Sequence, residues 1–583
     1  MINMVAGRLL RGHHILVKGG IYVKKNKKMI VGFLAPAVII FLIVFLYPII
    51  RTIMMSMYKI ESVTDTMEWW TFVGLGNYQK LFTTAIFKTA MMNILKIWAL
   101  GGIIVLSVSL LFGVILTSGI RGKKFFRAII YLPNIVSAVA LATMWLQYVY
   151  SSKFGLLKSV LDSLGLHKLA KTPWLDSDHK FWALLFAYCF GMIGYHMLIW
   201  MSGIERISPD LFEAATIDGA NKPQQFRYMT MPLLKGVFKT NITMWTVSTA
   251  AFFVWSQLFS TVTADKATIV PVQYMYMHTF GAGNAVTERN AGYGAAIGII
   301  LCLCVVIVFS ICNKLIKDCL LYTSDAADEW ILAASLSTTT DIFAGKALKF
   351  PTGLHFENYV QAWGSGGVAT FFMNSMLYSL VSCFLLILIC APAAYVLARF
   401  TFLGNKIIQT SFVSAMGIPI TMIVLPLFSV VANLGILNSV FASKVTLIFL
   451  YIGINIPYTT IFLLTFFSNL SRTYEEAAAI DGCPPTKTFW KIMFPMAQSG
   501  IVTVTIFNFI NIWNEYFLSL IFANNDTLRP VAVGLYGMLQ SMQYTGNWAG
   551  MFAAVVIVFL PTFILYLFLS EKIIGGVTGG IKG

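Results

Sequence analysis

The sequence predicts an all-α polytopic membrane protein built from two consecutive helical bundles. Of its 583 residues, 58% are hydrophobic and only 11% are charged, and the mean hydropathy is +0.77. An ordinary soluble domain has about 25% charged residues, and its interior could not hide this much apolar surface. Aromatic residues make up 14% of the chain, which excludes a disordered protein. Lipid must therefore solvate much of the surface.

The positive charge follows the pattern of a membrane protein. The net charge is +17, and Lys and Arg concentrate in short connectors beside apolar runs. The connector 121–127 carries four basic residues and no acidic one, so we expect it on the cytoplasmic side. Nucleic-acid binding is not expected, because no basic stripe alternates with stacking aromatic residues.

The first unit, residues 29–317, contains six apolar runs close to the 20 residues that a membrane-spanning helix needs. Its core covers about 89–314. A basic segment, residues 1–28, precedes it without a cleavage site and is predicted to be cytoplasmic. The six runs lie at about 29–51, 91–117, 126–149, 181–203, 236–262 and 291–314.

The second unit, residues 330–583 with a core at about 369–571, has only five clear runs. A first span is expected before them, but Asp325, Asp328 and Glu329 would each cost about 2.5–3.5 kcal/mol at a helix centre. Residues 318–329 are therefore interpreted as a junction. The five runs lie at about 369–398, 406–431, 443–467, 498–522 and 548–570.

One polar segment occurs twice. Residues 207–232 read ISPDLFEAATIDGANKPQQFRYMTMP, and residues 470–495 read LSRTYEEAAAIDGCPPTKTFWKIMFP. Glu213 and Glu476, like the two terminal prolines, are separated by 263 positions, so the copies match without a gap. Each copy is too polar to cross the membrane and favours a short helix. The glycine that follows predicts a left-handed or flexible helix stop.

These segments resemble the EAA loop of permease subunits from binding-protein-dependent ABC importers. The shared pattern is EAA, three residues, Gly and a later apolar–Pro pair. The second half is more narrowly similar to the carbohydrate-uptake, maltose-permease-like group through FPTGLHFENY, NIWNEYFLSLIF, TLRPVAVGL and GGVTGGIKG, and the first half resembles the partner permease through NAGYGAAIG. The resemblance implies two MetI-like permease bundles, with six and five clear spans and cytoplasmic EAA coupling helices, in a bacterial plasma membrane.

The resemblance also implies partners. It predicts a cytoplasmic ABC ATPase dimer, an extracytoplasmic sugar-binding protein and surrounding membrane lipid. ATP and Mg²⁺ are expected on the ATPase and no cofactor on this chain, because the sequence lacks a G-x-x-x-x-G-K-[ST] phosphate loop. The chain is therefore not expected to be an enzyme, and its eight cysteines show no metal-binding spacing.

The family motif assigns the coupling residues, whereas the pathway residues come from polar and aromatic positions inside the apolar runs. An intramembrane carboxylate suggests function, although a structural hydrogen bond between helices is the alternative. Aromatic rings and amides would suit a sugar. The predicted coupling residues are Glu213, Ala214, Ala215, Asp218, Gly219, Pro232, Glu476, Ala477, Ala478, Asp481, Gly482 and Pro495. The predicted pathway residues are Tyr195, Asn241, Trp245, Asn511, Asn514 and Glu515.

The sequence thus predicts the permease component of an ABC importer for a sugar or oligosaccharide. One alternative is an ion-coupled secondary transporter that uses Glu515. Another is a nonfunctional chimera of two neighbouring permease genes, because the run LLYTSDAADE in the junction resembles translated sequencing-adapter sequence. A natural fusion is the rival of the chimera, since the segment after Trp330 resembles the end of a truncated first span.

Overall fold

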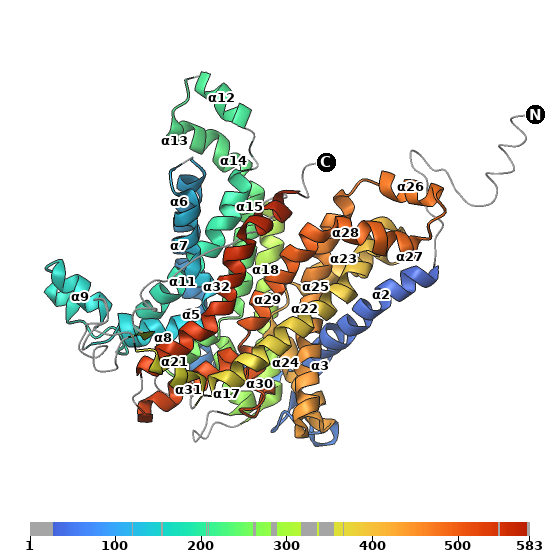
Figure 1. The fold of residues 1–583 in the computed structure, drawn as a ribbon. Helices are drawn as coiled ribbons and strands as arrows, with labels where there is room; N and C mark the ends of the chain where they lie inside the picture. Colours follow the sequence, from blue (N-terminus) through green and yellow to red (C-terminus); the bar gives the residue numbers. More distant parts are fainter. Residues whose placement is uncertain are drawn as a thin grey trace, which may run out of the picture.

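Figure 1 shows the computed structural model, in which the described residues are mostly helical. In the described part of the chain, strands are limited to a short antiparallel hairpin of β1 (Tyr58–Lys59) and β2 (Thr71–Phe72). The all-α prediction is confirmed. The structure describes residues 27–118, 120–152, 155–205, 207, 209–217, 219–260, 264–281, 289–315, 335–336, 355–364, 367–545 and 548–579.

Each of the six predicted runs of the first unit contains helix. In chain order these helices are α2 (Lys27–Phe41), η1 (Leu42–Leu46) and α3 (Tyr47–Met55); α5 (Ala85–Lys96), η3 (Ile97–Gly101) and α6 (Gly102–Thr117); α7 (Lys123–Ile135), α8 (Ala138–Met144) and η4 (Trp145–Val149); α11 (Lys180–Ile204); α15 (Lys235–Ala250) and α16 (Val254–Phe259); and α18 (Ala291–Leu315). Shorter connecting helices are η2 (Met67–Trp69), α4 (Gly76–Thr83), α9 (Leu156–Ser163), α10 (His167–Ala170) and α17 (Pro271–Phe280).

The five predicted runs of the second unit are helical too. They are α22 (Val368–Arg399); α23 (Asn405–Ala415) and α24 (Ile420–Asn433); α25 (Val440–Asn469); α29 (Gln498–Trp513) and α30 (Phe517–Phe522); and α32 (Trp548–Gly579). The connecting helices are α21 (Glu357–Trp363), η7 (Ile436–Asn438) and α31 (Val531–Thr545).

Several spans are bent or broken. Helices α23 and α24 meet at 98°, with the extended Pro419 as the residue before α24. Proline cannot donate the backbone hydrogen bond that would continue the first helix, so the break occurs there. By length and composition, six helices in the described ranges could cross a membrane, or nine if each of three bent pairs counts as one span.

The two units repeat the same helix contacts. The bounds of α15 and α16 become those of α29 and α30 when each residue number is raised by 263. In the first unit, a Cβ added to Gly203 would lie 2.5 Å from Val237 Cγ2. In the second unit the large and small residues exchange helices, since the offset pairs Gly203 with Phe466 and Val237 with Gly500. A Cβ on Gly500 would lie 2.6 Å from the ring of Phe466. The same crossing thus uses a glycine on opposite helices.

The first span of the chain packs on the second unit. Helix α2 contacts α22 and α25, and α3 contacts α24, so the blue N-terminal helix lies beside yellow and orange helices in Figure 1. A Cβ on Gly453 of α25 would lie 2.4 Å from Val44 Cγ2, and Thr52 Oγ1 donates a hydrogen bond to Met422 O at 2.6 Å. The N-terminal span therefore covers part of the second core.

A contact just before the second unit's described spans matches a contact at the end of the first span. In the first unit, Tyr78 Oη donates to Ser56 Oγ at 2.9 Å, just after α3. In the second unit, Tyr359 and Ser335 share a hydrogen bond of 2.5 Å, and Asn358 Nδ2 donates to Ser335 O at 3.0 Å. Ser335 therefore occupies the place that Ser56 holds at the end of the first span. The truncated span itself stays a prediction, because residues 316–334 lie outside the described part of the chain.

Two predicted regions fall largely outside the described residues. Of the basic segment 1–28, only the last two residues are described, and the junction 318–329 is not described at all. The domain boundaries therefore stay predictions.

Candidate coupling segments and transport pathway

The two EAA sequences form matched helical segments at the same end of the bundle. Figure 1 places both at its top, opposite α17, α30 and α31. The first segment is α12 (Pro209–Ile217), α13 (Lys222–Gln225), η5 (Phe226–Thr230) and α14 (Met231–Leu233). The second is α26 (Thr473–Ile480), α27 (Pro485–Thr488), η8 (Phe489–Met493) and α28 (Phe494–Met496).

Both EAA helices end in the same hydrogen-bonded stop. Gly219 has φ +82°, and Ala220 N donates to Ala215 O at 2.8 Å. This is the Schellman arrangement, in which a glycine with positive φ satisfies the last carbonyls of a helix. The expected left-handed stop is confirmed. The matching features of the second segment are φ +71° at Gly482 and the bond from Cys483 N to Ala478 O at 2.8 Å.

Each EAA helix exposes two apolar side chains at matched positions. Ile217 is 87% exposed and Ile480 is 80% exposed. Leu211 and Tyr474, at 45% and 46%, form the second matched pair. Exposed apolar side chains that recur at equivalent places on a polar segment are typical of a protein-binding surface.

The other predicted coupling residues divide by exposure. Glu213, Ala214, Pro232, Ala477, Asp481 and Pro495 are exposed, Glu476 is half-buried, and Ala215 and Ala478 are buried; Asp218 lies outside the described residues. The alternating burial of the alanines gives each helix one face toward the permease and one toward solvent.

Sequence reasoning missed the residue that anchors the second segment. Glu475, the neighbour of the motif glutamate, is only 8% exposed. Its Oε1 accepts a hydrogen bond from Tyr395 Oη at 2.8 Å, and its Oε2 lies 3.3 Å from Arg399 Nε. No motif signals this contact, because the partners lie at the end of a distant span.

The predicted pathway residues of the first unit lie inside its own core. Asn241 is fully buried, and its Oδ1 lies 2.7 Å from His196 Nδ1. Trp245 donates from Nε1 to Trp98 O at 2.8 Å and packs closely on α6. Tyr195 is half-buried beside His196. These contacts join helices within one unit.

The predicted pathway residues of the second unit lie at the break between α29 and α30. Asn511 is exposed, whereas Asn514 and Glu515 are half-buried. Glu515 accepts hydrogen bonds from Leu518 N at 2.6 Å, Ser519 N at 3.0 Å and Ser519 Oγ at 2.6 Å. Its carboxylate thus caps the short helix α30. A cavity shared with the group around Trp245 stays a prediction.

Aromatic residues join the two units where the broken spans meet. Phe253 precedes α16 and Tyr516 precedes α30, and the 263-residue offset makes them equivalent. Their ring centroids lie 6.5 Å apart, and the Phe253 and Phe517 centroids lie 4.7 Å apart. The repeat offset could have identified this contact from the sequence.

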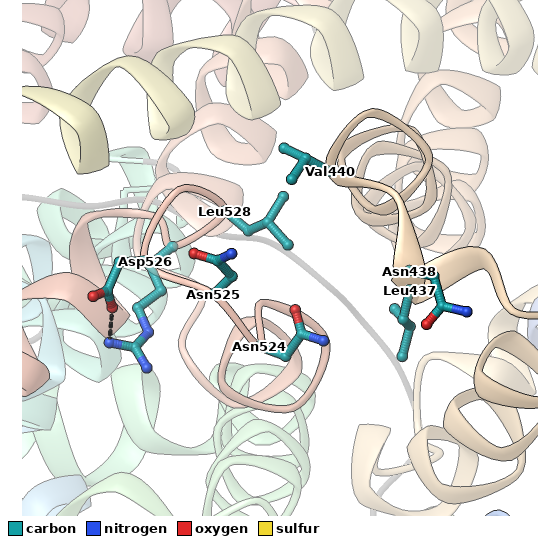
Figure 2. Close-up of a pocket in the computed structure, with 8 residues that line it drawn as sticks. Leu437, Asn438, Val440, Asn524, Asn525, Asp526 and Leu528 are labelled. Atoms are coloured by element: carbon teal, nitrogen blue, oxygen red, sulfur yellow. Dashed lines mark hydrogen bonds and ion pairs between the residues drawn. The ribbon is translucent and has the colours of Figure 1, made fainter.

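A cavity of about 450 Å³ opens at the end of the second unit opposite the EAA segments. Figure 2 shows that it lies between η7 with the start of α25 and the connector from α30 to α31. Amide groups and the Asp526–Arg529 ion pair give it a polar lining. The lining residues are Leu437, Asn438, Val440, Asn524, Asn525, Asp526, Leu528 and Arg529.

Comparison with known proteins gives two matches to one family within this chain. Residues 109–318 and 384–573 match the family described as "Binding-protein-dependent transport system inner membrane component".

Three relatives illustrate the similarity. The diacetylchitobiose uptake system permease protein NgcG of Streptomyces coelicolor is 32% identical over 251 residues, which are 43% of this chain and 82% of the relative. The sulfoquinovosyl glycerol transport system permease protein SmoH of Agrobacterium fabrum is 33% identical over 44% of this chain and 87% of its own length. The arabinooligosaccharides transport system permease protein AraP of Bacillus subtilis is 30% identical over 48% of this chain and 87% of its own length.

Proposed function

Because the chain belongs to the family of inner membrane components of binding-protein-dependent transport systems and carries two such domains, we propose that it is a tandem permease that imports a sugar or oligosaccharide. ATP would be hydrolysed on a separate ATPase chain with its own Mg²⁺. The two bundles would alternate between inward-open and outward-open arrangements around the substrate.

The sugar assignment is supported by the relatives. Their names refer to diacetylchitobiose, sulfoquinovosyl glycerol and arabinooligosaccharides, all of which contain a sugar unit. Their shared feature is a molecule rich in hydroxyl groups. A polar pathway with aromatic surfaces suits such a cargo, because hydroxyls need hydrogen-bond partners and C–H faces pack on rings.

The proposed contact with the ATPase is supported most directly by two exposed side chains. Ile217 and Ile480 are almost fully exposed at equivalent positions of two otherwise polar segments. Burial of an isoleucine in a groove of another protein is worth about 1.5–3 kcal/mol. Two matched isoleucines therefore fit a partner with two matched grooves, such as an ATPase dimer, with Glu213 and Glu476 placed to orient each helix.

An extracytoplasmic binding protein is the second proposed partner. It would face the end of the bundle opposite the EAA segments, where the cavity of Figure 2 opens. The pathway itself would run from that end past Asn511, Asn514 and Glu515. Tyr195, Asn241 and Trp245 would support the first unit, and substrate would reach them only after helix movement, since both Asn241 and Trp245 are buried.

The alternative of ion coupling through Glu515 has less support. The carboxylate oxygens already accept hydrogen bonds from the first residues of α30. Such a capping role accounts for an intramembrane carboxylate without an ion.

The chimera hypothesis depends on DNA rather than on protein chemistry. An artificial join predicts that independent long sequencing reads across the locus contain two reading frames. A single uninterrupted frame encoding LLYTSDAADE would establish a natural fusion, and the place held by Ser335 would then be a retained remnant.

The experiment for the proposed function replaces both exposed isoleucines. Ile217→Lys together with Ile480→Lys should abolish co-purification of the ATPase from native membranes and reduce uptake of a panel of labelled chitobiose, cellobiose and arabino-oligosaccharides. The charges prevent burial of the helix surface in an apolar groove. Membrane insertion should not change, since both residues lie outside the spans.

Leu164→Lys is the matched control, because Leu164 is 67% exposed at the start of the α9–α10 connector. It should leave ATPase retention unchanged. Normal ATPase retention in the isoleucine double variant would contradict the coupling assignment. Failure of every sugar in the panel, with ATPase retention intact in the parent chain, would contradict the sugar assignment.

A further inference from the structure

The second coupling segment is tied to the core by a buried ionic cluster. Arg399 is the last residue of α22, and Glu475 lies in the first turn of α26. Their side chains are 5% and 9% exposed, with 3.3 Å between Nε and Oε2. Arg399 Nη2 also donates to Leu470 O at 2.6 Å, and Tyr395 Oη donates to Glu475 Oε1 at 2.8 Å. The cluster therefore fixes both the start of α26 and the chain that leads into it.

A glutamate at the start of a helix would ordinarily face solvent and interact with the helix dipole. Glu476 fits that description better, because it is only half-buried. Glu475 instead points into the protein, where an unpaired carboxylate would be strongly unfavourable. Its position is therefore determined by Arg399 and Tyr395 rather than by the helix end.

At the matching positions of the first coupling segment, the described residues form no such cluster. The 263-residue offset pairs Glu475 with Phe212, and α6 ends at Thr117 where α22 ends at Arg399. Thr117 Oγ1 donates to Gly113 O of its own helix at 2.8 Å. Neither Phe212 nor Thr117 can form an ion pair, so these described positions of the first unit do not repeat the link.

Helix α22 connects this cluster to the opposite end of the protein. Asn374 Nδ2 donates to Thr527 O at 2.9 Å and to Arg529 O at 3.1 Å, and Tyr378 Oη donates to Leu528 O at 2.9 Å. These carbonyls belong to the connector that lines the cavity of Figure 2. Asn374 and Arg399 lie about 38 Å apart along one helix at 1.5 Å per residue.

The corresponding helix of the first unit keeps only one of these attachments. Asn93 Nδ2 donates to Lys266 O and Ile269 O, both at 3.0 Å, so the outer connector is held in the same way. Between Asn93 and Thr117 the 33-residue helix passes through the π-helical segment η3, whereas α22 is α-helical throughout and contains Pro392. A continuous helix fixed at both ends is found in the second unit.

We propose that Arg399, Glu475 and Tyr395 are positioning residues that transmit movement of the second coupling segment through α22 to the cavity between Asn438 and Asn525. This inference rests on the proposed coupling function. ATP-driven movement of α26 shifts the end of α22, and the bonds of Asn374 and Tyr378 move the outer connector with it. The first coupling segment acts on its own bundle without this link.

The test measures the cavity directly. Spin labels at Asn438→Cys and Asn525→Cys, in a chain whose eight native cysteines are replaced, report the width of the cavity in the assembled complex with ATPase and binding protein. The distance should change when Mg-ATP with vanadate is added to the parent chain. In the Glu475→Gln variant, the ATP-driven change in the distance between the labels should fall to less than half of the change in the parent chain. ATPase retention should be unchanged.

Two further variants separate positioning from folding. Tyr395→Phe removes one hydrogen bond and should reduce the distance change partially, and Arg399→Gln combined with Glu475→Gln should respond more strongly than either single variant, because no unpaired charge remains. Glu205→Gln is the matched control, since it breaks the exposed Lys123–Glu205 pair of 2.6 Å in the first unit. It should respond like the parent chain.

An unchanged ATP-driven distance change in Glu475→Gln would overturn the inference. Loss of ATPase retention in that variant would also overturn it, because the cluster would then serve docking alone. Failure of the proposed function has a different signature. In that case the parent chain itself would show no response to ATP, and the Ile217 and Ile480 variants would retain the ATPase.

Discussion

The two coupling segments share one backbone path and differ in how they are attached. Both have matched helices, a glycine stop with positive φ and an exposed isoleucine near the end. In the second segment a buried ion pair fixes the helix to the adjacent span, and the described residues at the matching positions of the first form no such pair. The shared features are those needed to meet a partner with two equal sites, whereas attachment to the bundle can differ between copies. The comparison shows that the two segments share their exposed features and differ in the described contacts to the bundle.

The largest expected effect concerns the exchanged glycine contact. Phe466→Gly should lower the free energy of unfolding by about 3–5 kcal/mol, because it leaves a cavity and puts glycine inside α25. Gly500→Val should lower it by about 1–3 kcal/mol through overpacking against Phe466. The double variant reproduces the Gly203–Val237 pair of the first unit and should be more stable than the Phe466 single variant. Thermal unfolding of the purified protein in detergent measures all three.

Additive losses in that double variant would contradict the equivalence of the two crossings. Recovery of the free energy of unfolding in the double variant would show that either helix can supply the small residue. Such a double-mutant cycle detects the coupling between two sites.

The next effect concerns the helix stops. Gly219→Leu with Gly482→Leu should reduce uptake about tenfold, because each leucine would occupy a left-handed conformation that costs about 1–2 kcal/mol. A Cβ would meet no atom within 4 Å at either glycine, so the effect comes from the backbone alone. Gly482→Leu alone should be milder than Gly219→Leu alone, since Glu475 also holds α26.

Gly165→Leu provides the control for that strain. Gly165 has φ +75° and equally open surroundings, but it lies in the α9–α10 connector. Uptake should stay close to that of the parent chain. Equal losses in the two single EAA variants would indicate that the ion pair does not support the second segment.

The smallest effect concerns the truncated span. Tyr78→Phe and Tyr359→Phe each remove one hydroxyl that bonds to Ser56 or Ser335. Each should lower the free energy of unfolding by about 1 kcal/mol, the usual net value of a hydrogen bond. Tyr228→Phe, at an exposed site, should have no effect in the same thermal unfolding assay. A loss at Tyr78 without a loss at Tyr359 would show that the remnant does not replace the span end.

The sequence predicted the helices and the repeat because both depend on local information. Apolar runs must be helical in lipid, where every backbone group needs an internal partner. The motif also identified the glycine stops, whose positive φ is a property of a few consecutive residues. Family membership, suggested by the same motif, is confirmed by the match over both halves.

The sequence could not distinguish residues whose role depends on distant neighbours. The motif directs attention to Glu476, but the buried carboxylate is Glu475, and its partner lies at the end of another span. Trp245 is an aromatic residue of the kind expected along a sugar pathway. In the structure it packs against Gly102, where an added Cβ would lie 2.8 Å from Trp245 Nε1. Which face of a helix meets another helix is a tertiary property that composition does not encode.

The position of α2 on the second core has a consequence for biosynthesis. Helix α2, the first helix in the described part of the chain, packs on α22 and α25, which end 358 and 428 residues after it. At about 5–20 residues per second, the interval until α22 is complete lasts roughly 18–72 seconds. During this time α2 has lipid as its neighbour, which carries little energetic cost for an apolar helix. A ribosome that stops after the first bundle would thus release a membrane-inserted chain in which α3 can pack on α18, but α2 lacks the surfaces of α22 and α25.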